Sequence, residues 1–177
     1  AHLLRALDVV VSLGALVFLS PLLALLALLV RLEVGRPILF RQRRVSIDNS
    51  EFTILKFRTL AEVDVTESDV DWSARTRAAG PVGRLLRASS LDELPQLWNV
   101  LRGDMSLVGP RPERPEFVAN LTAQIPFYGQ RHVVRPGLTG WAQVRHRYGS
   151  TIEDAQEKLQ YDLFYIKHVS LPFDFYV

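Results

Sequence analysis

The longest apolar stretch of the chain runs from Val9 to Val30 and contains no charged residue. A helix needs about 20 such residues to cross the hydrocarbon core of a bilayer. A signal peptide explains the stretch less well, because its apolar part covers only about 7–15 residues before a small-residue cleavage site. The pattern therefore predicts a membrane segment. The alternative that remains is a buried helix in a soluble core.

The dipeptide Ser20-Pro21 interrupts this stretch near its middle. Proline lacks a backbone donor and clashes with the carbonyl four residues earlier, so the helix should bend there. The Ser20 hydroxyl can bond a freed carbonyl, which makes a bend tolerable in lipid. Basic residues favour the cytoplasmic side, and they lie before the stretch at Arg5 and after it at positions 31, 36, 41, 43 and 44. A kinked span and a re-entrant hairpin both fit this pattern, and the basic flanks favour the hairpin.

Beyond residue 33 the pattern changes to short alternating and amphipathic segments. Two β-prone runs, Ile38–Arg41 and Phe52–Phe57, flank a turn-rich stretch and predict a β-hairpin. Leucine spacing predicts helices around 85–86 and over 94–101, the second ending at Gly103. Another helix is expected within 112–130, and a last one over 151–167 that opens with a capping box. Residues 61–80 suit a surface loop or a weak helix, and 135–140 a loop, because Pro and Gly break both regular structures.

Together these elements predict an α+β fold that is mostly helical. It would combine an N-terminal re-entrant membrane helix-break-helix, a small β-hairpin and interfacial amphipathic helices. We assign residues 1–33 to the membrane hairpin and residues 34–177 to a domain at the cytoplasmic face of the membrane, the two forming one functional unit. The chain starts at Ala1 and stops inside an apolar run, so we expect the natural protein to continue.

The adjacent carboxylates Asp92 and Glu93 are the first candidates for chemistry. Ser90 and Glu93 have the spacing of a capping box, so Glu93 could simply close off a helix start. Pro95 is comfortable only in a first helical turn, which places Asp92 at a helix N-terminus where a carboxylate stays ionised and phosphate is attracted. An ionised Asp beside a phosphate can act as a nucleophile. From the residues alone, capping is the stronger of these two interpretations.

Cationic side chains in segments rich in Gly and Pro are the second group of candidates. Arginine suits bidentate binding of phosphate, and rigid prolines would hold it in place. Each residue alone is explained equally well as a solvated charge or a contact with lipid headgroups. The set consists of Lys56, Arg58, Arg87, Arg111 and Arg135. Two neighbouring carboxylates together with substrate phosphates are also the usual surroundings of Mg²⁺.

Several classes of site are excluded or disfavoured by composition and spacing. The chain has no cysteine, so disulfides and thiolate metal sites are excluded. Its four histidines lack zinc-ligand spacing, and it contains no nucleophile-elbow, Walker or dinucleotide-binding motif. A formal net charge of +2 is too small to indicate nucleic acid as a partner.

Four ordered blocks of the sequence resemble the bacterial sugar transferases, the monotopic polyprenyl-phosphate phosphoglycosyl transferases. The most specific is RASSLDELPQLWNVLRGDMSLVGPRP at 87–112. The others are Ser20-Pro21 within the apolar stretch, ILKFRTL at 54–60 and RPGLTGWAQV at 135–144. Leu60 departs from the Met that is usual in the family, which is a conservative change. The segment after residue 148 is similar to larger exopolysaccharide-type members, in which this domain is the C-terminal catalytic part.

The resemblance implies an enzyme and assigns roles to its residues. Asp92 would attack the sugar-linked phosphate of a UDP-sugar, release UMP and form a phosphosugar–enzyme intermediate. Polyprenyl (undecaprenyl) phosphate would then accept the phosphosugar in a ping-pong cycle. Glu93 would help to hold Mg²⁺, Asp162 matches an acidic position of the last helix that we also assign to the metal, and Arg87, Arg111 and Arg135 match arginines near the phosphates. The implied location is the cytoplasmic face of the bacterial inner membrane, in contact with the lipid bilayer, and a homodimer is compatible with it.

Two other classes of function compete with this one. A membrane-anchored interaction module, in which Asp92 and Glu93 only cap a helix, predicts that Asp92→Asn changes no activity. A hydrolase of phosphate esters predicts release of free sugar phosphate without a lipid acceptor. The sequence does not specify the sugar.

Overall fold

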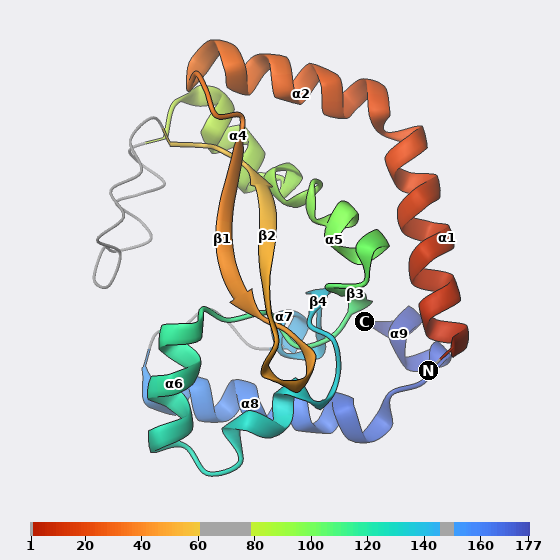
Figure 1. Cartoon of the computed structure of the whole chain (residues 1–177), viewed down its shortest axis with the longest axis vertical. Coiled ribbons are helices and arrows are strands. Elements are labelled where there is room, and N and C mark those ends of the chain that lie inside the picture. The colour runs from red at the N-terminus through yellow and green to blue at the C-terminus, as the bar shows by residue number, and fades with distance from the viewer. Residues whose placement is uncertain (1, 61–78, 146–150) are drawn as a thin grey trace.

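The computed structural model describes residues 2–60, 79–145 and 151–177. In this part of the chain, helices surround two small sheets (Figure 1). Most of the stretch 61–80, for which a loop or weak helix was expected, lies outside the described residues. The fold is α+β and mostly helical, as predicted.

The N-terminal apolar stretch forms two helices, α1 (His2–Phe18) and α2 (Ser20–Glu33), which meet at an angle of 64°. The break lies at the predicted Ser20-Pro21, where Pro21 occupies the first turn of α2 and the Ser20 hydroxyl donates to the Val17 carbonyl at 2.8 Å. None of the described helices is by itself long and apolar enough to cross a bilayer. The bent pair together meets that requirement by length and composition.

The N-terminal end of this bent pair is bonded to the rest of the domain. Arg5 donates to the carbonyls of Val100 and Leu101 at 2.6 and 2.8 Å, at the C-terminal end of α5 (Gln96–Arg102). The buried Asp8 carboxylate accepts from the Leu107 amide at 2.9 Å and from the hydroxyl of the preceding serine at 2.8 Å, both in β3 (Ser106–Val108). These bonds hold α1 against α5 and β3.

The C-terminal end of the pair is bonded to α4 (Pro81–Ala88). Both carboxylate oxygens of Glu33 accept backbone amides of α4, from Val82 and Gly83, at 2.9 Å each. The first amides of a helix have no partner within it, so an approaching carboxylate satisfies them. Gly80 permits this approach, because a side chain there would collide with the Glu33 carboxylate. The bent pair therefore contacts the domain at both of its ends.

The predicted β-hairpin is present and longer than expected. Strands β1 (Leu39–Val45) and β2 (Glu51–Phe57) are antiparallel, with Leu39 opposite Phe57 and Val45 opposite Glu51. A short 3₁₀ helix, η1 (Ile47–Asn49), joins them. The hairpin links two parts of the core, since Phe57 packs with α2 and α4 while Val45 packs with the C-terminal helices.

The free edge of β2 is covered by α5. Asn99 of α5 is almost fully buried, accepts from the Leu55 amide at 3.1 Å and donates to the Thr53 carbonyl at 2.8 Å. The Asn99 side chain thus bonds the two backbone groups of β2 that a neighbouring strand would otherwise bond. Beside it, Phe52, Ile54, Val100 and Met105 form a buried cluster between β2 and α5.

The expected loop at 135–140 contains a short strand, which corrects that prediction. β4 (Gly137–Thr139) pairs in parallel with β3, with Ser106 opposite Gly137 and Val108 opposite Thr139. The contact depends on glycine, because a side chain at Gly137 would collide with the backbone of Gly109. Glycines usually indicate a loop, but here they allow the backbone of β4 to approach the backbone next to β3 closely.

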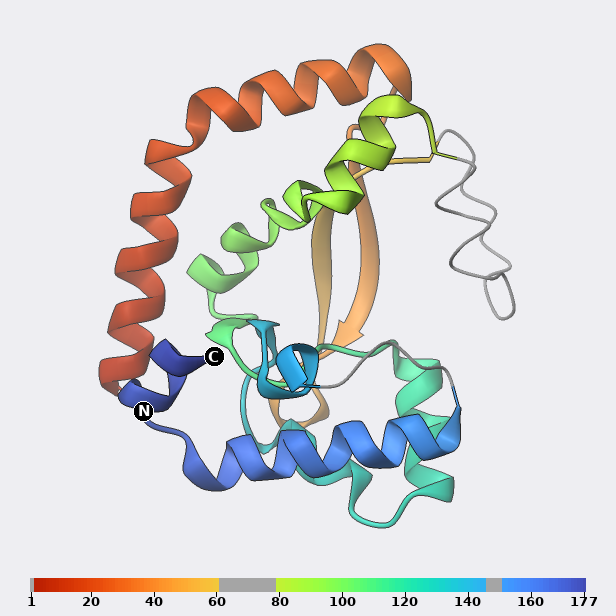
Figure 2. The ribbon, with the colours of Figure 1, turned by 180° about the vertical axis from the view of Figure 1, so that it is seen from behind.

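The longer of the remaining helices form a C-terminal layer at the turn end of the hairpin (Figures 1 and 2). The predicted helix within 112–130 is divided into α6 (Pro115–Gln124) and the 3₁₀ helix η3 (Tyr128–Val133). α7 (Trp141–Arg145) follows β4, and α9 (Leu171–Tyr176) closes the chain. α8 (Ile152–His168) begins with the predicted capping box, in which Thr151 and Asp154 exchange hydrogen bonds. Val118, Ile125 and Leu159 form the core of this layer.

We predict that Asn99→Ala lowers the free energy of unfolding by about 2–3 kcal/mol, because it removes two hydrogen bonds between a buried side chain and the backbone of β2. Urea titration in detergent measures this loss. The control is Asn120→Ala at an exposed position of α6, which should change stability by less than about 0.5 kcal/mol. Equal stability of the two variants would show that Asn99 does not close the sheet edge.

Candidate active site

The Asp92-Glu93 pair lies in η2 (Leu91–Glu93), a 3₁₀ turn between α4 and α5. Viewed from behind, α4, η2 and α5 form a diagonal from α2 toward α1 (Figure 2). Helical backbone begins at Leu91, as expected, but its first turn is the 3₁₀ turn η2, and the α-helix α5 starts at Gln96 after the helical residues Leu94 and Pro95. Asp92 therefore lies in a 3₁₀ turn that leads into α5.

Glu93 does not form the capping box that its spacing indicated. Ser90 makes no side-chain capping bond, and it has a left-handed backbone with φ of 57°. A capping residue normally has an extended backbone, which directs its hydroxyl at the amides of the first turn. The capping interpretation is therefore wrong, and the Glu93 side chain is available for other partners.

Two leucines fix this turn against α2. Leu91 and Leu94 flank the carboxylates and pack on the cluster that includes Leu26 and Val30 of α2. Because these partly buried leucines pack on that side, the apolar face of α2 helps to determine where the two carboxylates lie.

Glu93 is held between two cations from distant parts of the chain. Its Oε1 accepts from Lys56 Nζ of β2 at 2.6 Å and from Arg111 Nη2 at 3.2 Å. All three side chains are less than one-third exposed. Burial opposes the charge of Glu93, but Arg111 and Lys56 outweigh it and hold the pKa of Glu93 below its ordinary value. Glu93 is thus ionised, and its single negative charge is shared between two cations.

Asp92 has a different environment from its neighbour. In the described part of the chain its carboxylate takes part in none of the recorded ion pairs. Burial raises the pKa of Asp92 despite the attraction of Lys56 and Arg87. A desolvated carboxylate without a bound cation is a stronger nucleophile than one in an ion pair, so Asp92 is the better candidate for attack on phosphorus.

The other predicted phosphate-binding residues fall into two groups. Some lie close to the Asp92-Glu93 pair, and others are bonded to the ends of neighbouring helices. Arg87 lies in the last turn of α4, near enough to influence Asp92, and its Nε donates to the Thr59 hydroxyl at 2.8 Å. Arg58 donates to the Val34 carbonyl at 2.7 Å, just after α2, and Arg135 donates to the Gly103 carbonyl at 2.9 Å, just after α5. The structure thus brings Lys56, Arg87 and Arg111 to the carboxylates, while the recorded contacts of Arg58 and Arg135 are with helix ends.

Sequence reasoning missed Arg131, which supports the site from below. Arg131 forms a buried ion pair with Asp162 of α8 at 2.8 Å and donates to the Tyr128 hydroxyl at 2.7 Å. Its Nη2 also donates to the backbone carbonyl of Arg111 at 2.9 Å. Burial disfavours the charge of Arg131, but Asp162 outweighs it and keeps the pKa of Arg131 above its ordinary value. The pair thus holds the backbone of the residue whose side chain reaches Glu93.

A magnesium site would have to be completed by substrate. The described residues contain no group of three or more Asp, Glu, His or Cys side chains arranged to hold a metal ion. Mg²⁺ is commonly held by one or two carboxylates together with substrate phosphates, so Glu93 fits that arrangement. Both ion pairs of Glu93 use its Oε1 atom, and no ion pair within the described residues uses its Oε2 atom. The role of Asp162 at the metal stays a prediction, since its recorded ion pair is with Arg131.

Comparison with known proteins places the chain in a family. The family model described as bacterial sugar transferase matches residues 1–177. The chain is 43% identical over 177 residues to UDP-N-acetylgalactosamine-undecaprenyl-phosphate N-acetylgalactosaminephosphotransferase of Aeromonas hydrophila, covering 98% of this chain and 41% of that protein. It is 46% identical to UDP-glucose:undecaprenyl-phosphate glucose-1-phosphate transferase of Caulobacter vibrioides, covering 94% of this chain and 63% of that protein. It is 38% identical to exopolysaccharide production protein PSS of Rhizobium leguminosarum, covering 96% of this chain and 88% of that protein. The chain belongs to the bacterial sugar transferase family, and it spans less than two-thirds of the length of the first two relatives.

We predict that Asp162→Asn destabilises the domain by about 3–5 kcal/mol, because it leaves the Arg131 charge buried without a partner. The double variant Arg131→Met/Asp162→Leu should recover most of this loss. Urea unfolding in detergent, with and without Mg²⁺, measures both effects.

The same-helix control Glu153→Gln changes an exposed carboxylate and should leave stability nearly unchanged. If Asp162 acts mainly as a metal ligand, the loss will appear only when Mg²⁺ is present. If it acts through Arg131, the loss will be the same in both conditions.

Proposed function

We propose that this chain transfers a sugar 1-phosphate from a UDP-sugar to polyprenyl phosphate and releases UMP. The observation that carries the proposal is the unequal pair in η2, with Glu93 bound by Lys56 and Arg111 and Asp92 outside the recorded ion pairs. The names of the relatives support the reaction class, since both phosphotransferases act on undecaprenyl phosphate. Those names differ in the sugar, so the proposal extends to UDP-sugars as a class.

In the first half-reaction, an Asp92 carboxylate oxygen attacks the phosphorus that carries the sugar. A bond forms between that oxygen and phosphorus, and the bond to the oxygen bridging the two phosphates breaks. UMP leaves with the electron pair of the broken bond. Lys56, Arg87 and Arg111 lie where they can balance the charge on the phosphate oxygens. The product is a phosphosugar joined to Asp92.

In the second half-reaction, a phosphate oxygen of polyprenyl phosphate attacks the same phosphorus. The bond between phosphorus and Asp92 breaks, and the carboxylate is restored with its negative charge. The lipid leaves as a polyprenyl diphosphate sugar. The lipid phosphate is itself the nucleophile of the second displacement, so the protein has to supply only one. A single carboxylate outside the ion pairs suits that requirement.

Mg²⁺ would be held by Glu93 together with the diphosphate of the UDP-sugar. When bound, it would neutralise charge on the phosphate oxygens and on the leaving UMP. Glu93 suits this role, because its lowered pKa keeps it ionised over the physiological range.

The bent pair supports a monotopic arrangement at the cytoplasmic face of the bacterial inner membrane. A straight span would place the start of α1 across the bilayer from the end of α2. Instead, Arg5 and Asp8 at the start and Glu33 at the end are bonded to the same domain. Outward-facing side chains of the pair are apolar and exposed, including Val10, Val17 and Leu28. We propose that α1 and α2 enter and leave the membrane on one side.

We predict that Asp92→Asn lowers UMP release from a UDP-sugar by at least about 1,000-fold, because the amide cannot act as the nucleophile. Asp48→Asn, in the exposed turn of the hairpin, should keep the wild-type rate. A coupled assay for UMP measures both. Full release by Asp92→Asn would exclude the nucleophile, and release of free sugar phosphate by the wild type without lipid would indicate a hydrolase.

The membrane topology gives a separate prediction, tested with single cysteines in this cysteine-free chain. A cysteine at position 2, at the start of α1, should react with an impermeant maleimide only after spheroplasts are permeabilised. Ser50→Cys, in the exposed turn of the catalytic domain, should behave identically. Labelling of position 2 but not position 50 in intact spheroplasts would contradict the re-entrant arrangement.

A further inference from the structure

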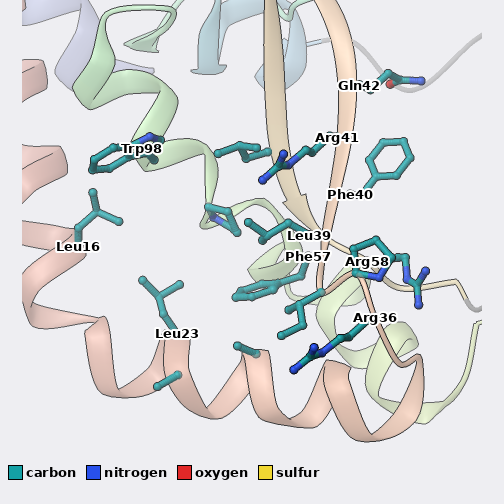
Figure 3. A pocket seen from close by; sticks show the side chains of 16 residues that line it. Leu16, Leu23, Arg36, Leu39, Phe40, Arg41, Gln42, Phe57, Arg58 and Trp98 are labelled. Atoms are coloured by element: carbon teal, nitrogen blue, oxygen red, sulfur yellow. The ribbon is translucent and has the colours of Figure 1, made fainter.

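An open groove of about 1640 Å³ lies between the bent helix pair, the hairpin and the start of α5 (Figure 3). Its wall on the α1–α2 side is entirely apolar. That wall consists of Leu16, Leu23, Ala24 and Ala27. The groove therefore joins the surface of the proposed membrane helices to the domain that carries the active site.

The opposite wall adds positive charge to an otherwise apolar surface. It includes Leu39 and Phe57 of the hairpin, and three arginines, Arg36, Arg41 and Arg58, but no acidic residue among those that line it. Figure 3 shows Arg41 extending from β1 into the space on the side of Trp98. Such a surface is complementary to a ligand with a long apolar chain and an anionic group.

Two of these arginines have no recorded partner within the described residues. Arg36 and Arg41 are exposed and take part in none of the hydrogen bonds or ion pairs found there. Arg43, two residues along the same strand, is instead paired with Glu51. Arg41 is thus a cation in an apolar groove and can bind an anion without breaking an existing contact.

One end of the groove reaches the segment that carries the two carboxylates. Pro95 lines the groove and lies two residues after Glu93, and Phe57, which also lines it, belongs to the buried cluster on which Leu91 and Leu94 pack. A nucleotide sugar is polar throughout and matches this lining poorly. We infer that the groove binds the isoprenoid chain of the lipid acceptor, with Arg41 binding its phosphate. This inference rests on the proposed function and locates its second substrate.

The inference is tested by narrowing the groove and by removing its charge. Ala24→Trp fills the apolar wall, and its control, Leu25→Trp, places the same bulk on a neighbouring exposed position outside the lining. Arg41→Gln removes the proposed phosphate contact, and its control, Arg43→Gln, removes an exposed arginine of the same strand outside the groove. Each protein is assayed in nanodiscs for two quantities, namely the burst of UMP without acceptor and the KM for the acceptor. The acceptors are undecaprenyl phosphate and a two-isoprene analogue.

We expect Ala24→Trp to raise the KM for undecaprenyl phosphate by about 10-fold or more, and the KM for the short analogue much less, because only the long chain needs the blocked wall. Arg41→Gln should raise the KM for both acceptors by about 10-fold, since both carry the phosphate. The UMP burst should persist in both variants, and both controls should match the wild type.

Several outcomes would overturn the inference. They are unchanged KM values in both groove variants, an equal effect of Ala24→Trp on long and short acceptors, and loss of the UMP burst in both groove variants. An increase in the wild-type KM as phosphatidylglycerol is added to the nanodisc would show that the groove accepts any anionic lipid. Absence of a UMP burst in the wild type would instead overturn the proposed function, so the two failures are distinguishable.

Discussion

The attachment of the bent helix pair at both ends is the constraint on which the rest of the structure depends. Arg5 and Asp8 bond the start of α1 to α5 and β3, and Glu33 bonds the end of α2 to the first amides of α4. The elements that receive these bonds, α4 and α5, are those that flank η2. The apolar pair and the two carboxylates are therefore held in one frame. Leu91 and Leu94 complete it by packing on α2.

Within that frame, two adjacent carboxylates acquire opposite properties. Glu93 faces Lys56 and Arg111, and its pKa is lowered, whereas burial raises the pKa of Asp92. Lys56 acts on both carboxylates, but Glu93 forms ion pairs with Lys56 and Arg111, whereas Asp92 has no ion pair within the described residues. Such a division of roles between two acids is a common basis for chemistry at neutral pH. Here it separates an electrostatic anchor from a candidate nucleophile.

The sequence predicted features that depend on local rules. The break at Ser20-Pro21, the hairpin and the capping box of α8 follow from proline geometry, strand pattern and capping chemistry. It failed at 135–140, because β4 exists only through pairing with a strand about thirty residues earlier. It also failed at Ser90, since an S-x-x-E spacing does not reveal a left-handed backbone.

For the site, residue types indicated the cations but not their partners. Lys56 and Arg111 reach Glu93 from positions 37 and 18 residues away along the chain, a distance over which no local pattern reveals a contact. Arg131 gave no signal, because a buried ion pair with a residue 31 positions later leaves no local pattern. The structure adds it as support for the Arg111 backbone.

The central claim is that Asp92 carries the phosphosugar between two substrates. The most direct measurement is the intact mass of the protein after mixing with a UDP-sugar, without lipid acceptor and with the released UMP removed enzymatically. The account predicts a mass increase of one sugar phosphate, located on Asp92 by fragmentation and lost when polyprenyl phosphate is added. An unchanged mass while the complete reaction proceeds, or an adduct on another residue, would contradict it.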